Sequence, residues 1–316
     1  MPKIITIYRP LECRPDSYGL WYQQGNTLRD WGQFQEALAS YDKALEYRTQ
    51  SYWAWYRRGN VLDELGDYKA AVASYDKALA IEPTDYWAWY ERAYGLRRLG
   101  CYQEALISYD KALQARPTDY WAWYNRGRVA VKDLHWYEEA IASFEIALEI
   151  RPTDYWAWYR HGEALRLLGR DQQAIASYDQ AIQTRPTDYW AWYRRGEACQ
   201  HQGDFKVAIS CYNKALDVRP RDYWAWYRRG ETLYQLGRYQ EALVSYERSR
   251  EVEPNDDYAV YNQACCYAQL EKVDLAIEAL QQVIKWNARK YQPLAKSDFA
   301  FDNLKQDQRF QRFILS

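Results

Sequence analysis

Apolar and aromatic positions recur along this chain with one long, fixed period. The pentapeptide Tyr-Trp-Ala-Trp-Tyr returns at intervals of 34 or 35 residues, beginning at Tyr52, Tyr86, Tyr120, Tyr155, Tyr189 and Tyr223. Degenerate copies begin at Tyr18 and Asp257, so eight units cover residues 18 to about 290. A period of this size indicates stacked units, each of which completes the hydrophobic core of its neighbour.

Each unit has the pattern of two packed helices. When Tyr189 is counted as position 1, Asp188 before it is a suitable N-cap, and Gly203 at position 15 is suited to ending the first helix. The second helix stops before Pro220, because proline cannot continue it. Position 8 is Gly in six units and position 20 is Ala in all eight, which lets the helices approach closely, and a large ring fills position 24. The pattern predicts antiparallel helical hairpins and an all-α fold.

This pattern resembles the tetratricopeptide repeat. In the sixth unit Trp192, Gly196, Ala208, Tyr212, Ala215 and Pro220 match the family's preferences at positions 4, 8, 20, 24, 27 and 32. The amino-acid sequence of the repeats is also similar to that of the tetratricopeptide arrays abundant in cyanobacteria. The resemblance implies a right-handed superhelical solenoid of eight hairpins, whose first helices line a concave groove.

Two features depart from the family pattern. Position 7, usually Leu, is Arg in five units and His161 in the fifth unit, and it lies on the packed side of the helix. A carboxylate at position 25 is available in most units, so we expect a ladder of Arg–carboxylate pairs, within or between units. The fourth unit has one extra residue and no Gly in its turn, which predicts an irregularity around Leu134 to Trp136.

The two ends differ from the repeat. Residues 1–17 form a separate N-terminal segment with two prolines, and residues 18–290 hold the eight repeats. Residues 291–316 are amphipathic and are expected to form a helical cap. The apolar residues expected to cover the last core face are Phe299, Phe301, Leu304, Phe310, Phe313 and Ile314.

Aromatic residues also recur on the side of the first helix that faces away from positions 4, 8 and 11. Position 2 is Trp53, Trp87, Trp121, Trp156, Trp190 and Trp224, and position 5 is Tyr in every unit, including Tyr56, Tyr90, Tyr124, Tyr159, Tyr193 and Tyr227. Two exposed tracks of this kind would exceed the apolar surface that a monomer normally leaves bare, which favours a bound partner. The alternative is that each Trp packs on a neighbouring Tyr and stiffens the array. The Trp at position 4 matches the structural Trp of the family.

Polar residues vary along the same side, and such variation can set specificity. Position 9 runs from Asn in the first units through Arg128 to Glu163, Glu197 and Glu231, and Arg97, Arg98 and Lys132 make the middle of the array basic. These charges suit a ligand with an acidic and an apolar segment, although they could also be a solvated face. The family's chaperone-tail clamp needs Lys at position 5, which is Tyr here, and its asparagine ladder would have only Asn125 and Asn262.

Composition narrows the function further. The formal net charge is −1, whereas a general polyanion binder would carry a basic excess. Single-stranded RNA stacked on the aromatic tracks remains the alternative from another class. The sequence contains no phosphate-binding loop, GxSxG or HExxH motif, so no enzyme, small-molecule substrate, cofactor or metal site is expected.

Targeting signals and the use of cysteine indicate the cellular compartment in which a protein resides. No signal peptide or membrane span is recognisable, and the six cysteines have no metal-binding spacing, which together favour a cytoplasmic protein. A redox role for the adjacent Cys265 and Cys266 is left open. The sequence therefore predicts a non-catalytic scaffold that holds an extended or helical segment of another protein. The resemblance to cyanobacterial arrays implies a role in the assembly or regulation of a multiprotein complex. The partner and the oligomeric state are beyond the sequence.

Overall fold

The computed structural model describes residues 17–315, and within that range every regular element is a helix. The N-terminal segment expected at residues 1–17 therefore lies, except for Ser17, outside the described residues. The chain divides into two compact units, Met1–Pro152 and Thr153–Ser316. The repeating sequence pattern gives no sign of this division.

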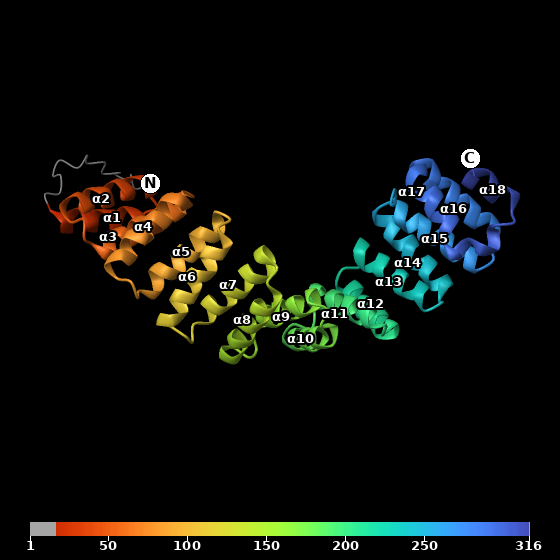
Figure 1. The fold of residues 1–316 in the computed structure, drawn as a ribbon, viewed down its shortest axis with the longest axis horizontal. Coiled ribbons are helices and arrows are strands. Elements are labelled where there is room, and N and C mark those ends of the chain that lie inside the picture. The colour runs from red at the N-terminus through yellow and green to blue at the C-terminus, as the bar shows by residue number, and fades with distance from the viewer. Residues whose placement is uncertain (1–16, 316) are drawn as a thin grey trace, which may run out of the picture. The chain divides into compact units, whose positions relative to one another are not determined.

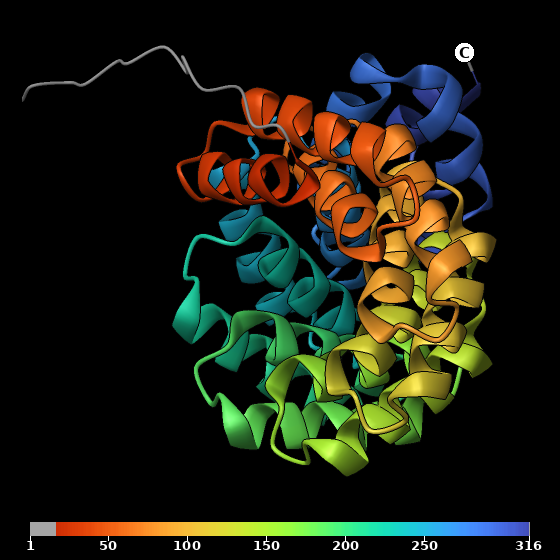
Figure 2. The same cartoon turned by 90° about the vertical axis from the view of Figure 1, so that its left-hand side faces the viewer.

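The first unit contains four helical hairpins in succession. They are α1 (Tyr18–Asp30) with α2 (Phe34–Tyr47), α3 (Tyr52–Glu64) with α4 (Tyr68–Ile81), α5 (Tyr86–Arg98) with α6 (Tyr102–Ala115), and α7 (Tyr120–Val129) with α8 (Tyr137–Ile150). The two helices of a hairpin pack along each other, and the second helix also packs on the first helix of the next hairpin (Figures 1 and 2). The first helices of consecutive hairpins are in contact as well, from α1 through α3 to α5.

The second unit contains four further hairpins and a terminal cap. The hairpins are α9 (Tyr155–Leu167) with α10 (Asp171–Thr184), α11 (Tyr189–Gln202) with α12 (Phe205–Val218), α13 (Tyr223–Gln235) with α14 (Tyr239–Val252), and α15 (Asp257–Gln269) with α16 (Val273–Trp286). The cap consists of α17 (Ala288–Ser297), a 3-10 helix at Phe299–Leu304 (η2) and α18 (Gln308–Leu315). Phe301, Leu304 and Phe310 are buried against α15 and α16, whereas Phe299, which we expected in the same core, is exposed.

The predicted caps and turns explain where the helices begin and end. Asp188 accepts a hydrogen bond from the backbone N–H of Ala191 at 3.0 Å, and the Asp before most other repeats does the same. Gly203 has a φ of +85°, which a residue with a side chain rarely adopts. In the fourth repeat, which lacks this Gly, a π-helical turn at Ala130–Leu134 (η1) extends α7, and His135 has a φ of +59°. The predicted irregularity is therefore confirmed.

The core of six hairpins contains one close contact between a glycine and a ring. The ring at position 24 is buried against the Gly at position 8, and a Cβ on Gly196 would lie 2.8 Å from Cε1 of Tyr212. In the third repeat the corresponding residues are Ala93 and Tyr109, both buried. The small residues and the large rings that the sequence pattern places opposite each other are therefore in contact between the two helices of a hairpin.

The arginine ladder expected at position 7 is present and connects neighbouring repeats. Arg92 Nε donates to Asp76 Oδ1 of the preceding repeat at 2.6 Å, and Arg92 Nη1 donates to Ser108 Oγ of its own repeat at 2.6 Å. The same arrangement holds for Arg58 and Arg126 and, with Asn213 as acceptor, for Arg229. Since the carboxylates are about half exposed, each ion pair adds little stability by itself, and its main effect is to fix the register of adjacent repeats.

Candidate partner-binding surface

The Trp at position 2 lies on the surface that the first helices of the repeats form within each compact unit. We call this surface the first-helix face. Between 43% and 55% of each Trp is exposed. The indole meets the ring of the adjacent position-1 Tyr edge-on, with centroids 4.9–5.0 Å apart. The structure therefore combines the two alternatives drawn from the sequence, since each Trp is both held by a Tyr and half open to solvent.

The Tyr at position 5 lies deeper than expected. In the repeats beginning at Tyr52, Tyr120, Tyr155, Tyr189 and Tyr223 only 5–8% of it is exposed. Tyr193, for example, stacks on Tyr189 with centroids 5.7 Å apart and also meets the buried ring of Tyr212. Burial, followed by the charge of Glu197, raises the pKa of Tyr193 to about 12. The expectation of a second exposed aromatic track is therefore corrected, because these rings form a layer under the Trp track.

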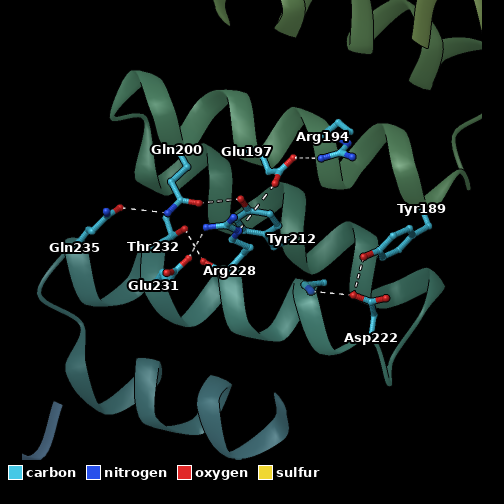
Figure 3. Close-up of polar contacts among 11 residues, drawn as sticks. Tyr189, Arg194, Glu197, Gln200, Tyr212, Asp222, Arg228, Glu231, Thr232 and Gln235 are labelled. Atoms are coloured by element: carbon cyan, nitrogen blue, oxygen red, sulfur yellow. Dashed lines mark hydrogen bonds and ion pairs between the residues drawn. The ribbon is translucent and has the colours of Figure 1, made fainter. Parts of the chain in front are cut away.

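The position-1 Tyr has a structural role that the sequence analysis missed. Tyr189 Oη donates to Asp222 Oδ1 at 2.7 Å, and Asp222 is the N-cap of the next first helix, α13 (Figure 3). Tyr223 makes the same bond to Asp256 at 2.7 Å. The recurrence of Tyr at position 1 together with Asp one residue before the next unit was the signal that could have revealed this link.

Acidic and basic residues of the first-helix face neutralise each other in the second unit. Glu197 accepts from Arg194 Nη1 at 2.6 Å, three residues earlier on α11, and lies 3.9 Å from Arg228 Nε on α13 (Figure 3). Glu231 is paired with Arg228 at 2.8 Å, and Glu163 with Arg160 at 2.6 Å. The negative charges of the three position-9 glutamates are therefore already compensated.

The first unit has a different polar surface. Arg128 Nη1 donates to Asn125 Oδ1 at 3.3 Å, and Asn125 Nδ2 donates to Tyr90 Oη at 2.8 Å. The guanidinium groups of Arg97 and Arg98, expected in a basic middle, lie over the rings of Tyr94 and Tyr68.

Two acidic groups on α3 and α5 have unusual protonation equilibria. Burial, and then the negative charge of Asp63, raises the pKa of Glu91 to about 7. Burial is also the largest reason why the pKa of Asp63 rises to about 6, and the nearby Glu64 adds to it. Tyr75 Oη donates to Asp63 Oδ2 at 3.5 Å. Both carboxyl groups therefore retain protons at a pH where most carboxyl groups have lost them.

Arginine side chains from the ends of the second helices cover the Tyr–Trp pairs. The residue at position 31 precedes the loop proline in the second to seventh repeats. In the sixth repeat it is Arg219, whose guanidinium carbon lies 4.4 Å from the Tyr189 centroid and 5.4 Å from that of Trp190. Arg116, Arg151 and Arg185 lie in the same way over the pairs of their own repeats. The sequence analysis did not single out these arginines, because they lie far along the chain from the rings.

The remaining features concern possible metal ligands, buried titratable groups and membrane-spanning helices. Within residues 17–315 no group of three or more His, Cys, Asp or Glu side chains is arranged to hold a metal ion. His161 takes the place of the ladder arginine, with its Nδ1 3.0 Å from Ser177 Oγ, and burial lowers its pKa to about 4. Burial also raises the pKa of Cys266 to about 12. None of the helices that the structure describes has the length and apolar character needed to cross a membrane.

Family models match most of the repeats. Models described as tetratricopeptide repeat match residues 52–85, 86–119, 122–154, 187–252 and 258–290, and one described as TPR repeat matches residues 25–66 and 162–203. None of the curated proteins matches the sequence.

Solved structures resemble the chain over half of its length or more. YrrB, described as a TPR protein with an unusual peptide-binding site, is 25% identical with a TM-score of 0.54, and the match covers 58% of this chain and 95% of YrrB. The C-terminal part of a TPR repeat-containing protein from Cytophaga hutchinsonii is 19% identical with a TM-score of 0.64, covering 76% and 98% of the two chains. MamA is 23% identical with a TM-score of 0.52, covering 54% and 92%. The last two likenesses concern the fold alone.

Proposed function

The chain belongs to the tetratricopeptide repeat family, and we propose that it is a non-catalytic scaffold that binds an extended or helical segment of a partner protein on its first-helix face. The observation that carries this proposal is the half-exposed Trp at position 2 in six consecutive repeats. The set of contact residues expected from the sequence is thereby narrowed, with the Trp residues as the contacts and the position-5 Tyr rings as their support.

The exposed rings are suited to binding in amount and in rigidity. A Trp side chain offers about 150–250 Å², so six half-exposed ones exceed the few hundred Å² that a monomer usually leaves bare. Each indole meets the adjacent position-1 Tyr edge-on, and in the second unit the hydroxyl groups of Tyr189 and Tyr223 bond to the next repeat. A surface that is already fixed loses little conformational freedom when a ligand binds.

The charges beside the rings argue for a protein partner rather than a nucleic acid. Glu163, Glu197 and Glu231 lie on the first-helix face of the second unit, where a phosphate backbone would have to pass, and each is paired with an Arg that is then unavailable to a phosphate. The description of YrrB as peptide-binding adds a precedent within the family. A cytoplasmic location and a role in assembling a protein complex remain part of this proposal.

A displayed library of random peptides, selected on the intact protein, tests the proposal. We expect enriched peptides to bind at least about tenfold more weakly to a Trp156→Ala/Trp190→Ala/Trp224→Ala variant, since loss of several hot-spot rings typically costs this much or more. The matched control is Val207→Ala/Val244→Ala, which removes exposed apolar side chains from α12 and α14 and should leave binding unchanged. Circular dichroism verifies that both variants remain folded.

Two outcomes count against the proposal. Equal affinity of the folded Trp variant for the selected peptides would mean that the Trp residues are structural only. Tight binding of single-stranded oligonucleotides that falls steeply with salt, together with failure to enrich any peptide, would favour the nucleic-acid function instead.

A further inference from the structure

The position-31 residue varies in a way that separates two repeats from the others. In six repeats a cation at or after the end of the second helix covers the aromatic residue at position 1 or 2, namely Arg48, Arg116, Arg151, Arg185 and Arg219 and, in the last repeat, Lys290 of α17. In the second repeat the guanidinium of Arg57, on the first helix α3, lies 6.0 Å from the Trp53 ring centroid. In the second and seventh repeats position 31 is instead a glutamate, Glu82 or Glu253. Within residues 17–315, the seventh repeat is therefore the one whose Tyr–Trp pair has no cation over either ring.

The seventh repeat keeps the geometry of the cation site without its cation. Tyr223 and Trp224 are 4.9 Å apart at 78°, compared with 5.0 Å and 80° for Tyr189 and Trp190, which hold Arg219. The backbone of Glu253, with φ −121° and ψ 84°, is close to that of Arg219, with φ −127° and ψ 83°. The notch, by which we mean the space between the position-1 and position-2 rings, therefore has the same ring and backbone geometry in both repeats. The two notches differ in the side chain at position 31 and in the first residues of the next repeat.

An open cavity of about 460 Å³ lies at this notch. Its lining includes Tyr223, Trp224 and Glu253 from the seventh repeat and Asp257 and Tyr258 from the eighth. Trp224 is 55% exposed, more than any of the Trp residues covered by a position-31 arginine. Since no guanidinium or ammonium group within residues 17–315 is placed over Tyr223 or Trp224, their ring faces are open to a cation from outside.

The acidic groups around the cavity are not equivalent. Asp256 is engaged by Tyr223 Oη at 2.7 Å and by the backbone N–H of Ala259 at 3.0 Å, and Asp257 is paired with Lys290 at 2.9 Å. Among residues 17–315, no cation forms an ion pair with Glu253, and its charge contributes to raising the pKa of Tyr223, after the larger effects of burial and of Asp256. Glu253 is therefore the carboxylate available to a ligand.

We propose that the notch of Tyr223, Trp224 and Glu253 binds a cationic side chain, preferably arginine, of the partner segment. The chain itself shows the mode of binding, because Arg219 occupies the equivalent notch one repeat earlier. Aromatic faces attract the guanidinium through their quadrupole, and Glu253 supplies the counter-charge that the occupied notches lack. This inference rests on the proposed function for the source of the cation.

The site can be tested without any partner protein. The full chain is labelled with 15N at the Trp indoles, the Trp224 and Trp190 signals are assigned with Trp→Phe variants, and N-acetyl-arginine amide is titrated. We expect a saturable shift of the Trp224 signal, a smaller response to the lysine derivative, and at least about fivefold weaker binding of the citrulline derivative, which has the shape of arginine without its charge.

Reciprocal substitutions supply the controls. Glu253→Arg should place the chain's own guanidinium in the notch and abolish the Trp224 response, while Arg219→Glu should open a new site and make Trp190 respond. Glu247→Arg changes the same charge elsewhere on α14 and should leave the Trp224 response intact.

Equal shifts with the arginine and citrulline derivatives, or an unchanged Trp224 response in Glu253→Arg, would overturn the proposal. The result is independent of the peptide selection. If arginine binds at Trp224 but no peptide binds in a Trp-dependent way, only the scaffold function is refuted. If peptides bind in a Trp-dependent way but arginine does not bind at Trp224, only the cation site is refuted.

Discussion

At the residue scale, the depth of a side chain was harder to predict than its direction. Positions 2 and 5 were placed on one side of the first helix, yet Trp190 is 43% exposed and Tyr193 only 5%. A helical wheel gives the direction in which a side chain leaves its own helix, but the burial of Tyr193 is set by Tyr189 and by Tyr212 of α12. Those contacts depend on how the helices pack, which the period alone does not specify.

The same limit applies to the two protonated carboxyl groups. Position 12 of the second repeat and position 6 of the third are polar in the sequence, and nothing in the pattern indicates that Asp63 and Glu91 influence each other. Tyr56 and Tyr75 also face this pair, and Arg98 lowers the pKa of Asp63 slightly against the effect of burial. The interaction arises only because α3 and α5 lie side by side.

Stability should therefore depend on pH through Glu91 and Asp63. Their pKa values in the folded chain, about 7 and about 6, exceed those expected when unfolded, so the folded state binds more protons between pH 4.5 and 7. Stability should fall as the pH rises through this window and stay lower above it. Glu91→Gln should flatten the dependence and raise the free energy of unfolding at pH 8 by about 1–3 kcal/mol.

Urea unfolding of the wild-type chain and the variant, measured at several pH values, checks this prediction. Glu104→Gln on α6 is the control, since Glu104 is exposed and its loss should not alter the slope. An unchanged pH dependence in Glu91→Gln would show that Glu91 is ionised in the folded chain.

At the element scale, helix boundaries followed from the sequence because each is set by local chemistry. Asp caps, Gly at position 15 and the proline after the second helix act within a few residues, and the structure uses each of them. Of the two kinds of polar contact that join neighbouring hairpins, the sequence predicted one. The ladder of position-7 arginines was expected, whereas the bond from the position-1 Tyr to the next N-cap was not, since it joins residues 33 apart.

An N-cap Asp that also accepts a hydrogen bond from the position-1 Tyr of the preceding repeat should contribute more to the free energy of unfolding than an Asp that only caps its helix. Asp222 caps α13 through the N–H of Ala225 at 2.9 Å and accepts from buried Tyr189, whereas Asp67 caps α4 through Ala70 and has no such second bond. Asp67→Ala should cost about 1 kcal/mol. Asp222→Ala should cost about 2–3 kcal/mol, because the buried hydroxyl of Tyr189 also loses its acceptor.

Chemical denaturation of the single variants measures these costs, and a double-mutant cycle isolates the second bond. In the background of Tyr189→Phe the cost of Asp222→Ala should drop towards that of Asp67→Ala. If the cost is the same in both backgrounds, the Tyr–Asp bond does not stabilise the fold.

At the scale of the whole molecule, the repeated sequence predicts the order of the hairpins but not the division of the chain into two compact units. Because each repeat contacts mainly its neighbours, a period of 34 residues is sufficient to predict hairpins and their order. The division after Pro152 is not visible in the period, since the repeats on both sides have nearly the same sequence. The division follows the one repeat whose turn contains an inserted residue and a π-helical turn.

The second unit should fold when it is separated from the first. Residues 153–316 contain their own core and end in a cap, whose Phe301, Leu304 and Phe310 cover the apolar surface of α15 and α16. Terminal repeats of an array need such a covering element, and the described part of the first unit has no counterpart to α17 and α18. Residues 153–316 should therefore be helical and unfold cooperatively, at a higher temperature than residues 1–152.

Thermal unfolding followed by circular dichroism compares the fragments. A third fragment, residues 153–287, keeps all four hairpins and omits the cap, so Leu280 and Val283 lose the residues that bury them. Its midpoint should lie on the order of 10 °C or more below that of residues 153–316. Equal midpoints for these two fragments would mean that α17 and α18 lie on the array without stabilising it, and failure of residues 153–316 to fold would show that the second unit depends on the first.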